Sequence, residues 1–311
     1  MNENRRVFRI GTSGWSYPAK AEGSWTGIFY PPGKVDELSY YAQRFNTVEI
    51  NSTFYRPPVP GYAWNWAKKT PEHFDFTVKL WQKFTHPWMF KEKTGQDSKI
   101  TQEDVDSFKK GIEPLVKTKK LGCLLIQFPP SFQLNAPNQE GLDRILGYFE
   151  DYPMAVELRH RSWSDQLNVT ADTLSEHNAS LVYIDEPKFY FSIKQDFKLI
   201  GPIFYLRMHG RNVEKWFKHK SAAEKYNYLY SSDELEPFVK GLSDIKDMTK
   251  RLYVYMNNHY AAKAVANAIM IRYKLNLPID APFWKQLIAE YPELKEFPLN
   301  IEGEEDLFGK K

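Results

Sequence analysis

Cysteine is nearly absent from this 311-residue chain, and the single Cys123 excludes an internal disulfide and any multi-cysteine metal site. The chain also lacks an apolar run of about 18 or more residues and a signal-peptide pattern, which predicts a cytoplasmic protein with no membrane partner. A net charge of +3 is too small to indicate a nucleic-acid partner by bulk electrostatics. No Gly/Ser-rich or Pro-rich linker divides the sequence, so we expect a single domain over residues 1–311, with a barrel over about 7–275 and a C-terminal helix and tail over 276–311.

Eight short apolar runs are the main feature that is present. Each run ends in a polar residue, and within each run the polar residues share one parity. Side chains alternate between the two faces of a strand, so a fixed parity means a fixed direction. The runs are Phe8–Ser13, Thr47–Asn51, Phe74–Lys79, Cys123–Gln127, Ala155–Arg159, Leu181–Asp185, Phe204–His209 and Leu252–Asn257.

One parity is wholly apolar and is expected to face a layer of helices. The other parity is expected to point into a barrel, and its polar residues at the strand ends lie where such barrels have their active sites. This inward set includes Arg9, Glu49, Asn51, Asp75, Lys79, Gln127, Glu157, Arg159, Leu181, Tyr183, Asp185, Tyr205, Arg207, His209, Tyr253, Tyr255 and Asn257.

Segments with helical signals separate the runs. Helices are expected over Lys34–Phe45, Tyr62–Lys69, Thr101–Thr118, Gln139–Glu150, Ser164–His177 with Ser164 as N-cap, Ala222–Lys246 and Tyr260–Tyr273. The sixth connection, Pro187–Ile200, resembles an alternating strand pair more than a helix. Together these elements predict an α/β fold, a TIM-type (β/α)8 barrel that is irregular around its sixth β/α unit.

Aromatic residues gather in the loops after the first three runs, which predicts long aromatic loops over the C-terminal face of the barrel. The candidates for ligand contacts among them are Trp15, Tyr55 and Trp81, with His86 nearby. Aromatic faces stack on nucleobases at about 1–3 kcal/mol each and serve equally well against other amphipathic ligands. The alternative is that these loops fold over the barrel top as a minor core.

Glu49 and Glu157 are candidate catalytic carboxylates because both share the inward face at the ends of separate strands. Two such groups could act as a general acid and a general base. In the alternative, Glu157 pairs with Arg159 or Arg207 and Glu49 pairs with Lys79, which would make a structural ring of charges.

His209 is the third catalytic candidate. It lies just before Gly210 and beside Arg207 on the seventh run, a region where many such barrels bind phosphate. Arg suits an anion through its bidentate fork, and His suits proton transfer; alternatively, the His is buried against a carboxylate. The remaining ligand-binding candidates are Asn51, Lys79, Gln127, Arg159, Asp185, Arg207 and Asn257.

A metal site is disfavoured, and no cofactor is predicted. The sequence has suitable ligand types for zinc or manganese in its carboxylates and histidines. However, Lys79, Arg159 and Arg207 crowd the inward face and would oppose a divalent cation.

A set of motifs resembles a known family. The chain contains, in this order, IGTSGWSYP, FYPP, FNTVEINSTFYRPP, FTVKLWQKFTH, LLIQFPPSF, VELRHRSW, YLRMHG and YVYMNN. From about Arg9 to Tyr273 it resembles the YecE-like family of bacterial and archaeal proteins, a domain of unknown function (number 72). The resemblance implies a TIM-type barrel and supplies no activity. The family's fold is similar to that of endonuclease IV-type enzymes, which bind several metals through several histidines, whereas this chain has only one inward His.

The C-terminal tail is a candidate partner motif. Glu304–Phe308 ends in Asp-Leu-Phe, which resembles the short peptide by which bacterial replication proteins dock onto the sliding clamp, although its first two positions differ from that peptide. The alternative is a tail that folds back onto the barrel.

Three classes of function follow from the sequence. The first is an enzyme that uses acid/base chemistry on a phosphorylated or nucleotide-like ligand at the polar mouth of the barrel. The second is a nucleic-acid-binding protein, linked to DNA metabolism, without chemistry of its own. The third is a carbohydrate-active barrel that uses the two carboxylates.

Overall fold

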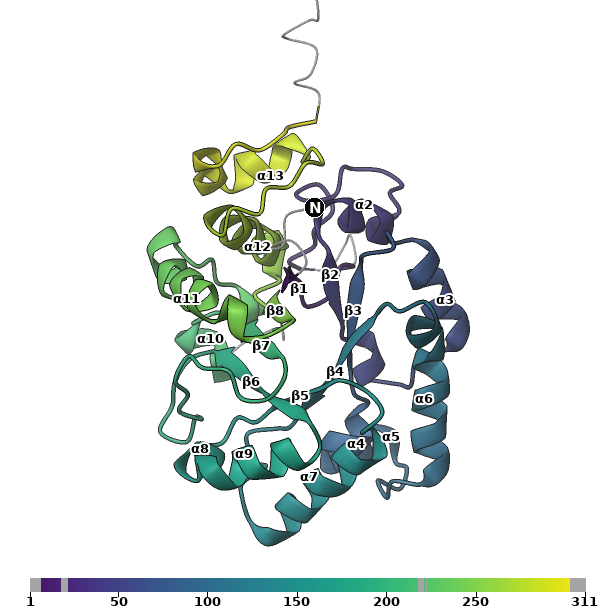
Figure 1. The fold of residues 1–311 in the computed structure, drawn as a ribbon. Helices are drawn as coiled ribbons and strands as arrows, with labels where there is room; N and C mark the ends of the chain where they lie inside the picture. Colours follow the sequence, from purple (N-terminus) through teal and green to yellow (C-terminus); the bar gives the residue numbers. More distant parts are fainter. Residues whose placement is uncertain (1–6, 18–21, 218–220, 222, 303–311) are drawn as a thin grey trace, which may run out of the picture.

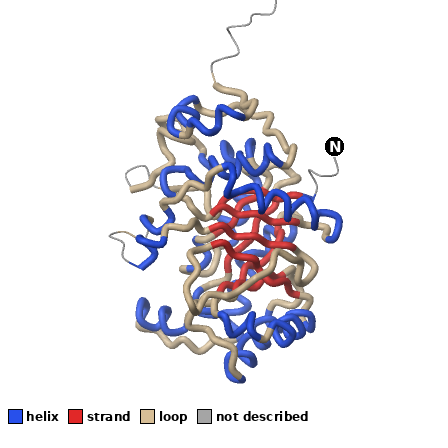
Figure 2. The backbone as a smooth tube through the Cα atoms, turned by 90° about the vertical axis from the view of Figure 1, so that its left-hand side faces the viewer, coloured by secondary structure: helices blue, strands red, loops and turns tan. Residues whose placement is uncertain are grey.

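The computed structural model describes residues 7–17, 22–217, 221 and 223–302, and its centre is an eight-stranded parallel sheet. The sheet order is β1-β8-β7-β6-β5-β4-β3-β2, so each strand lies beside its neighbour in sequence. Figure 1 shows the sheet curled into a barrel, and Figure 2 shows helices around the strands. The predicted TIM-type α/β barrel is confirmed.

Each predicted run coincides with one strand to within two residues at either end. The strands are β1 (Phe8–Thr12), β2 (Thr47–Ile50), β3 (Asp75–Lys79), β4 (Leu121–Gln127), β5 (Met154–Glu157), β6 (Ala179–Asp185), β7 (Phe204–Met208) and β8 (Leu252–Met256).

The helices follow the strands as predicted in most units. They are α2 (Glu37–Arg44), α3 (Pro60–Lys68), α4 (Gln82–Thr85), α5 (Pro87–Thr94), α6 (Gln102–Lys117), α7 (Ala136–Tyr148), α8 (Arg161–Asp165), α9 (Leu167–Glu176), α10 (Val213–Phe217), α11 (Ser232–Ile245), α12 (Lys263–Lys274) and α13 (Lys285–Glu290).

Two predicted helix starts are wrong. Ser164 is not an N-cap, because α8 begins earlier and its cap is His160, whose side chain accepts the backbone N–H of Ser162. The long helix before β8 starts at Ser232, since Ser231 and Glu234 form a capping box there. The predicted helix from Ala222 is therefore too long, because residues 227–231 are not helical; Ala222 itself lies outside the described residues.

The seam between β1 and β2 is joined mainly by side chains. One parallel bridge, Ser13 to Glu49, links the two strands directly. Elsewhere the Tyr41 hydroxyl accepts the Thr12 N–H at 2.9 Å and donates to the Thr47 carbonyl at 3.1 Å. Gly11 is required beside this contact, because a Cβ there would lie 2.3 Å from the Thr47 carbonyl oxygen.

The sixth β/α unit is irregular, as predicted, although the expected strand pair is wrong. Between β6 and β7 the chain forms no helix and no strand, only an isolated bridge from Ser192 to His160. This segment covers the outer side of β6, where the Tyr183 ring lies 5.0 Å from Phe197.

The inward face predicted for β6 is also wrong. Val182 pairs with Tyr205, and Ile184 pairs with Arg207, so these two apolar residues point into the barrel. Leu181 and Tyr183 therefore face outward. The alternation of side chains could not identify the inward face of this strand, because residues 181–184 are apolar on both faces, as is usual in buried parallel strands.

Within the described residues, no helix combines the length and the apolar character needed to span a membrane.

Candidate functional site

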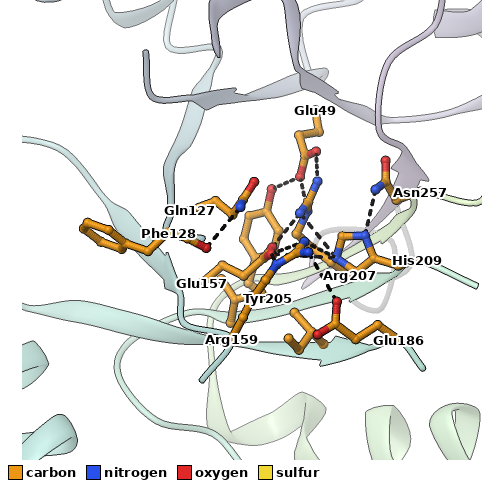
Figure 3. Close-up of polar contacts among 12 residues, drawn as sticks. Glu49, Gln127, Phe128, Glu157, Arg159, Glu186, Tyr205, Arg207, His209 and Asn257 are labelled. Atoms are coloured by element: carbon orange, nitrogen blue, oxygen red, sulfur yellow. Dashed lines mark hydrogen bonds and ion pairs between the residues drawn. The ribbon is translucent and has the colours of Figure 1, made fainter. Parts of the chain in front are cut away.

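Arg207 of β7 occupies the centre of the barrel interior, between two carboxylates. Its Nη2 and Nε donate to Glu49 of β2 at 2.7 and 2.9 Å, and its Nη1 donates to Glu157 of β5 at 2.5 Å. The Tyr205 hydroxyl adds a bond of 2.7 Å to Glu49. Both carboxylates are fully buried, and Figure 3 shows the guanidinium between them. The alternative pairing of Glu157 with both arginines is confirmed, whereas Glu49 pairs with Arg207 and not with Lys79.

Arg159 extends this network toward the mouth, the end of the barrel where the strands finish. Its Nε donates to Glu157 at 2.6 Å, and its Nη1 lies 3.3 Å from Glu186. Burial alone would raise the pKa of Glu157, but Arg159 and Arg207 hold it well below its usual range. The side chain of Arg159 is 14% exposed, in contrast to 2% for Arg207, so Arg159 is the guanidinium that a ligand can reach.

His209 follows β7 and is held as a neutral ring. Its Nε2 lies 3.3 Å from Arg159 Nη2 and 3.4 Å from Arg207 Nη1, so it must offer a lone pair to these donors. The Nδ1 then has the hydrogen, and the Asn257 amide 2.8 Å away is best satisfied with its oxygen turned toward the ring. Burial, together with the two arginines, lowers the pKa of His209 well below its usual value.

Lys79 ends β3 and has an unusual environment for a lysine. Its Nζ lies 4.2 Å from the centre of the Phe54 ring and has no hydrogen bond or ion pair to any described residue. Burial, followed by the charge of Arg207, lowers the pKa of Lys79 to about 7. His86, which packs on the same Phe54 ring, has its pKa lowered to about 3 by burial and by Lys79.

Buried polar atoms without hydrogen-bond partners gather at the mouth. Among the described residues, all such side-chain atoms except Arg44 Nε belong to segments that directly follow β1, β2, β3, β6 or β8. Buried polar groups are normally satisfied by protein or by bound molecules. The atoms are Ser13 Oγ, Asn51 Oδ1, Trp81 Nε1, Gln82 Oε1, Glu186 Oε2 and Asn258 Oδ1. Glu186 Oε2 makes no hydrogen bond, but it is the oxygen of the 3.3 Å ion pair with Arg159.

Glu186 is a mouth residue that sequence reasoning missed. Because the inward face of β6 is the one opposite to that predicted, Glu186, the residue after the strand, faces the network. Burial raises the pKa of Glu186. The interpretation that Asp185 points inward is wrong. Its carboxylate instead accepts two bonds of 2.9 Å from Arg211 and one of 2.6 Å from the Tyr230 hydroxyl. The signal that could have found Glu186 is the second acidic residue immediately after an ambiguous apolar run.

The aromatic residues of the loops divide into rings that pack against other rings and rings that are exposed at the edge of the mouth. Trp15 packs edge-on against Trp66 at 5.9 Å, and Trp81 packs against Phe90 at 5.3 Å, as in a minor core. Tyr55 is 62% exposed.

A second group of rings contains none of the predicted ligand contacts, although Tyr17 belongs to the aromatic loops expected near the mouth. Tyr17 stacks on His259 at 4.6 Å, and Tyr226 lies 4.8 Å from the same His259 and 6.5 Å from His209. These three residues, Tyr17, Tyr226 and His259, form an aromatic rim beside the network.

Other predicted contacts, and the residues whose type would suit a metal, do not assemble into one site among the described residues. The Gln127 amide donates to its neighbour's carbonyl, Phe128 O, at 3.1 Å. His160 lies at the start of α8. Throughout the described part of the chain, no three His, Cys, Asp or Glu side chains gather as a metal-binding group. The tail motif Glu304–Phe308 lies outside the described residues.

Comparison with known proteins gives consistent matches over most of the chain. A family model described as a protein of unknown function, DUF72, matches residues 9–290. The UPF0759 protein YunF of Bacillus subtilis is 30% identical over 271 residues, covering 83% of this chain and 91% of that protein.

Solved structures of DUF72 family proteins also match most of the chain. A DUF72 family protein from Thermotoga maritima is 34% identical with a TM-score of 0.74, covering 87% of this chain and 99% of that one. Another from Enterococcus faecalis is 26% identical with a TM-score of 0.76, covering 88% and 97%. The family resemblance inferred from the motifs is confirmed, and these names assign no activity.

Proposed function

The chain belongs to the DUF72 family of proteins of unknown function, and we propose that it is an enzyme acting on a small phosphorylated or nucleotide-like ligand at the mouth of its barrel. The ligand's anionic group binds Arg159, its polar groups satisfy the free atoms of the mouth, and proton transfer takes place at Lys79.

The observation that supports this proposal most is the set of unpartnered polar atoms at the mouth. Asn51 Oδ1, Gln82 Oε1 and Ser13 Oγ can all accept hydrogen bonds, so they fit a ligand that has hydroxyl or amino groups. A buried unsatisfied acceptor costs about 1–3 kcal/mol, which a ligand with matching donors would recover.

Charge supports an anionic ligand. Glu49 and Glu157 are both neutralised by guanidinium groups, and burial raises the pKa of Glu186, the third carboxyl group of the mouth. Arg159 then offers its exposed edge to the ligand, with Lys79 as a further cation when protonated. Arg suits a phosphate or carboxylate because its planar fork makes two parallel bonds.

The predicted catalytic roles of Glu49 and Glu157 are replaced by positioning roles in this proposal. A carboxylate that already accepts short bonds from guanidinium groups is a poor proton carrier near neutral pH. The glycosidase alternative is disfavoured for the same reason. Arg207 fills the space between the two carboxyl groups, where a scissile sugar bond would have to lie.

Thermal melting of the purified full chain tests the proposal, with inorganic phosphate, sugar phosphates, nucleotides and short oligonucleotides each added in turn. A ligand at 100 times its Kd stabilises the folded state by about 2.7 kcal/mol, a shift of several degrees. We expect a sugar phosphate or nucleotide to raise the melting temperature and Arg159→Gln to abolish the effect. The control is Arg161→Gln, two residues away, whose side chain pairs with Asp165 on the protein surface.

Other results would redirect the assignment. A shift from oligonucleotides alone would favour the nucleic-acid-binding alternative, and it should then weaken steeply with salt. No shift from any phosphate-bearing compound would contradict the proposal. The cytoplasmic location stays a prediction.

A further inference from the structure

We propose that Lys79 is a nucleophile that condenses with an aldehyde or ketone group of the ligand to form an imine at the mouth of the barrel. The inference rests on the proposed function, because it concerns the same ligand and names its class. The ligand is a small carbonyl compound that also has a phosphate or carboxylate group.

The placement of Lys79 supports this role. It is the last residue of β3, at the end of the barrel where the strands finish, and it is partly buried. The amine lies against the Phe54 ring face at 4.2 Å and makes no hydrogen bond or ion pair within the described part of the chain. A lysine in this position lies at the mouth with one aromatic ring as its neighbour and without a hydrogen-bond or ion-pair partner among the described residues to hold its amine.

Other buried lysines of the chain show what a structural role looks like. Lys83 forms an ion pair of 2.7 Å with Asp104. Lys120 donates three bonds of 2.6–2.9 Å, to the carbonyls of Ala67 and Thr70 and to the Thr70 hydroxyl. Lys79 has no such set of acceptors, so its amine remains available for reaction.

The surroundings also favour the neutral amine, which is the nucleophilic form. Buried lysines near other cations are activated in this way. With a pKa of about 7, roughly half of the Lys79 side chains are neutral at pH 7. An ordinary surface lysine with a pKa near 10.4 is neutral about a thousand times less often.

The reaction balances without an oxidant or reductant. The amine lone pair attacks the carbonyl carbon, a C–N bond forms, and one amine proton moves to the oxygen to give a carbinolamine. The C–O bond then breaks, and the hydroxyl leaves as water with the second amine proton. The product is an imine between the ligand carbon and Lys79 Nζ. Arg159 holds the anionic group of the ligand during these steps.

Reductive trapping tests the inference. The full chain is incubated at pH 7 with sodium cyanoborohydride and one of three probes, namely dihydroxyacetone phosphate, pyruvate or glyoxylate. Intact mass and peptide mapping then locate the label. We expect at least one probe to label Lys79 about tenfold or more above any surface lysine. Lys79→Arg should lose the label, and Lys83→Arg should keep it.

The controls separate this inference from the proposed function. Glycerol 3-phosphate has the anion but no carbonyl, so it should raise the melting temperature without being trapped. A melting shift from the phosphate compounds with no label at Lys79 would overturn the imine inference and leave the proposed function standing. No shift and no label would overturn both. If Lys79→Arg fails to fold, Lys79→Gln takes its place, and label persisting in a folded variant contradicts the inference.

Discussion

The two ends of this barrel both contain buried charges, yet most of the described side-chain atoms that are buried without a hydrogen-bond partner lie at one end. The exception, Arg44 Nε, lies near Arg9 at the other end. At the lower end, where the strands begin, Arg9 donates to Asp75 at 2.7 Å, and the Tyr253 hydroxyl donates to the same carboxylate at 3.3 Å. Arg251 lies 3.6 Å from it as well. At the mouth, the network from Glu49 to Arg159 is larger, and six buried side-chain atoms of the segments that follow the strands have no hydrogen-bond partner among the described residues.

This difference teaches that buried charge alone does not mark a functional site. The lower end even has a cavity of about 610 Å³, lined in part by Asp75 and Tyr253. Its charges are paired across strands, which fits the stabilising role usual at the lower face of such barrels. Unsatisfied groups and an unpaired lysine, not charge or volume, distinguish the mouth.

The largest effect is expected from removing the central guanidinium. Arg207→Met leaves Glu49 and Glu157 buried without their main partner, which should lower the free energy of unfolding by about 3–5 kcal/mol. Arg9→Met should cost less, because Asp75 is 8% exposed and keeps Arg251 and Tyr253 nearby. Urea unfolding of both variants measures the difference. An equal or larger loss for Arg9→Met would contradict the contrast between the two ends.

The second effect is a pH dependence of the free energy of unfolding that arises from the lowered pKa of Lys79. Its folded pKa of about 7 lies below the unfolded value near 10.4, so the unfolded state binds more protons between these values. Stability should therefore rise with pH across this window, by up to about 1.4 kcal/mol per pH unit. Lys79→Met should remove this contribution. Melting curves from pH 6 to 10 test the point, and parallel curves for the two proteins would refute it.

Two tyrosines allow a matched comparison of the ends. Tyr205→Phe removes a 2.7 Å bond to the fully buried Glu49 and a 3.0 Å bond to the Thr77 hydroxyl, and should cost about 1.5–3 kcal/mol. Tyr253→Phe removes a 3.3 Å bond to Asp75 and should cost about 0.5–1.5 kcal/mol. The same substitution at both ends leaves ring packing intact, so unfolding free energies compare the hydroxyl groups alone. A larger loss of unfolding free energy for Tyr253→Phe than for Tyr205→Phe would show that the lower end depends more on its tyrosine hydroxyl, which contradicts the prediction.

The smallest effect is expected at Glu186. Burial raises its folded pKa, so the stability that this group contributes is present below the unfolded pKa near 4.3 and is lost as pH rises through the folded value. Glu186→Gln should therefore gain stability relative to the native chain as pH rises from 4 to 7. Thermal melts at both pH values measure the change, and a relative loss at pH 7 would mean that the Arg159 ion pair outweighs burial.

Sequence periodicity predicted the barrel well because most strands alternate strictly. Polar residues such as Glu49 and Glu157 alternate with apolar neighbours along their strands. The position of a residue in the strand therefore predicts whether its side chain points into the barrel or outward. The prediction failed at β6, where Val182 and Ile184 are as apolar as Leu181 and Tyr183. In the predicted run Leu181–Asp185 the only charged residue is Asp185, at the very end, and it faces outward; Ser180, which shares the parity of Val182 and Ile184, lies just before that run.

The amino-acid sequence by itself determined the eight strands, their order and the residue types that reach the mouth. Only the tertiary structure decided which charges meet. Arg207 bridges Glu49 and Glu157 because strands β2, β5 and β7 close around one interior, and pairing across a barrel depends on distances that no single strand encodes. The same closure left Lys79 without a partner and placed Glu186, instead of Asp185, in the network, because strand register sets which neighbour each side chain faces.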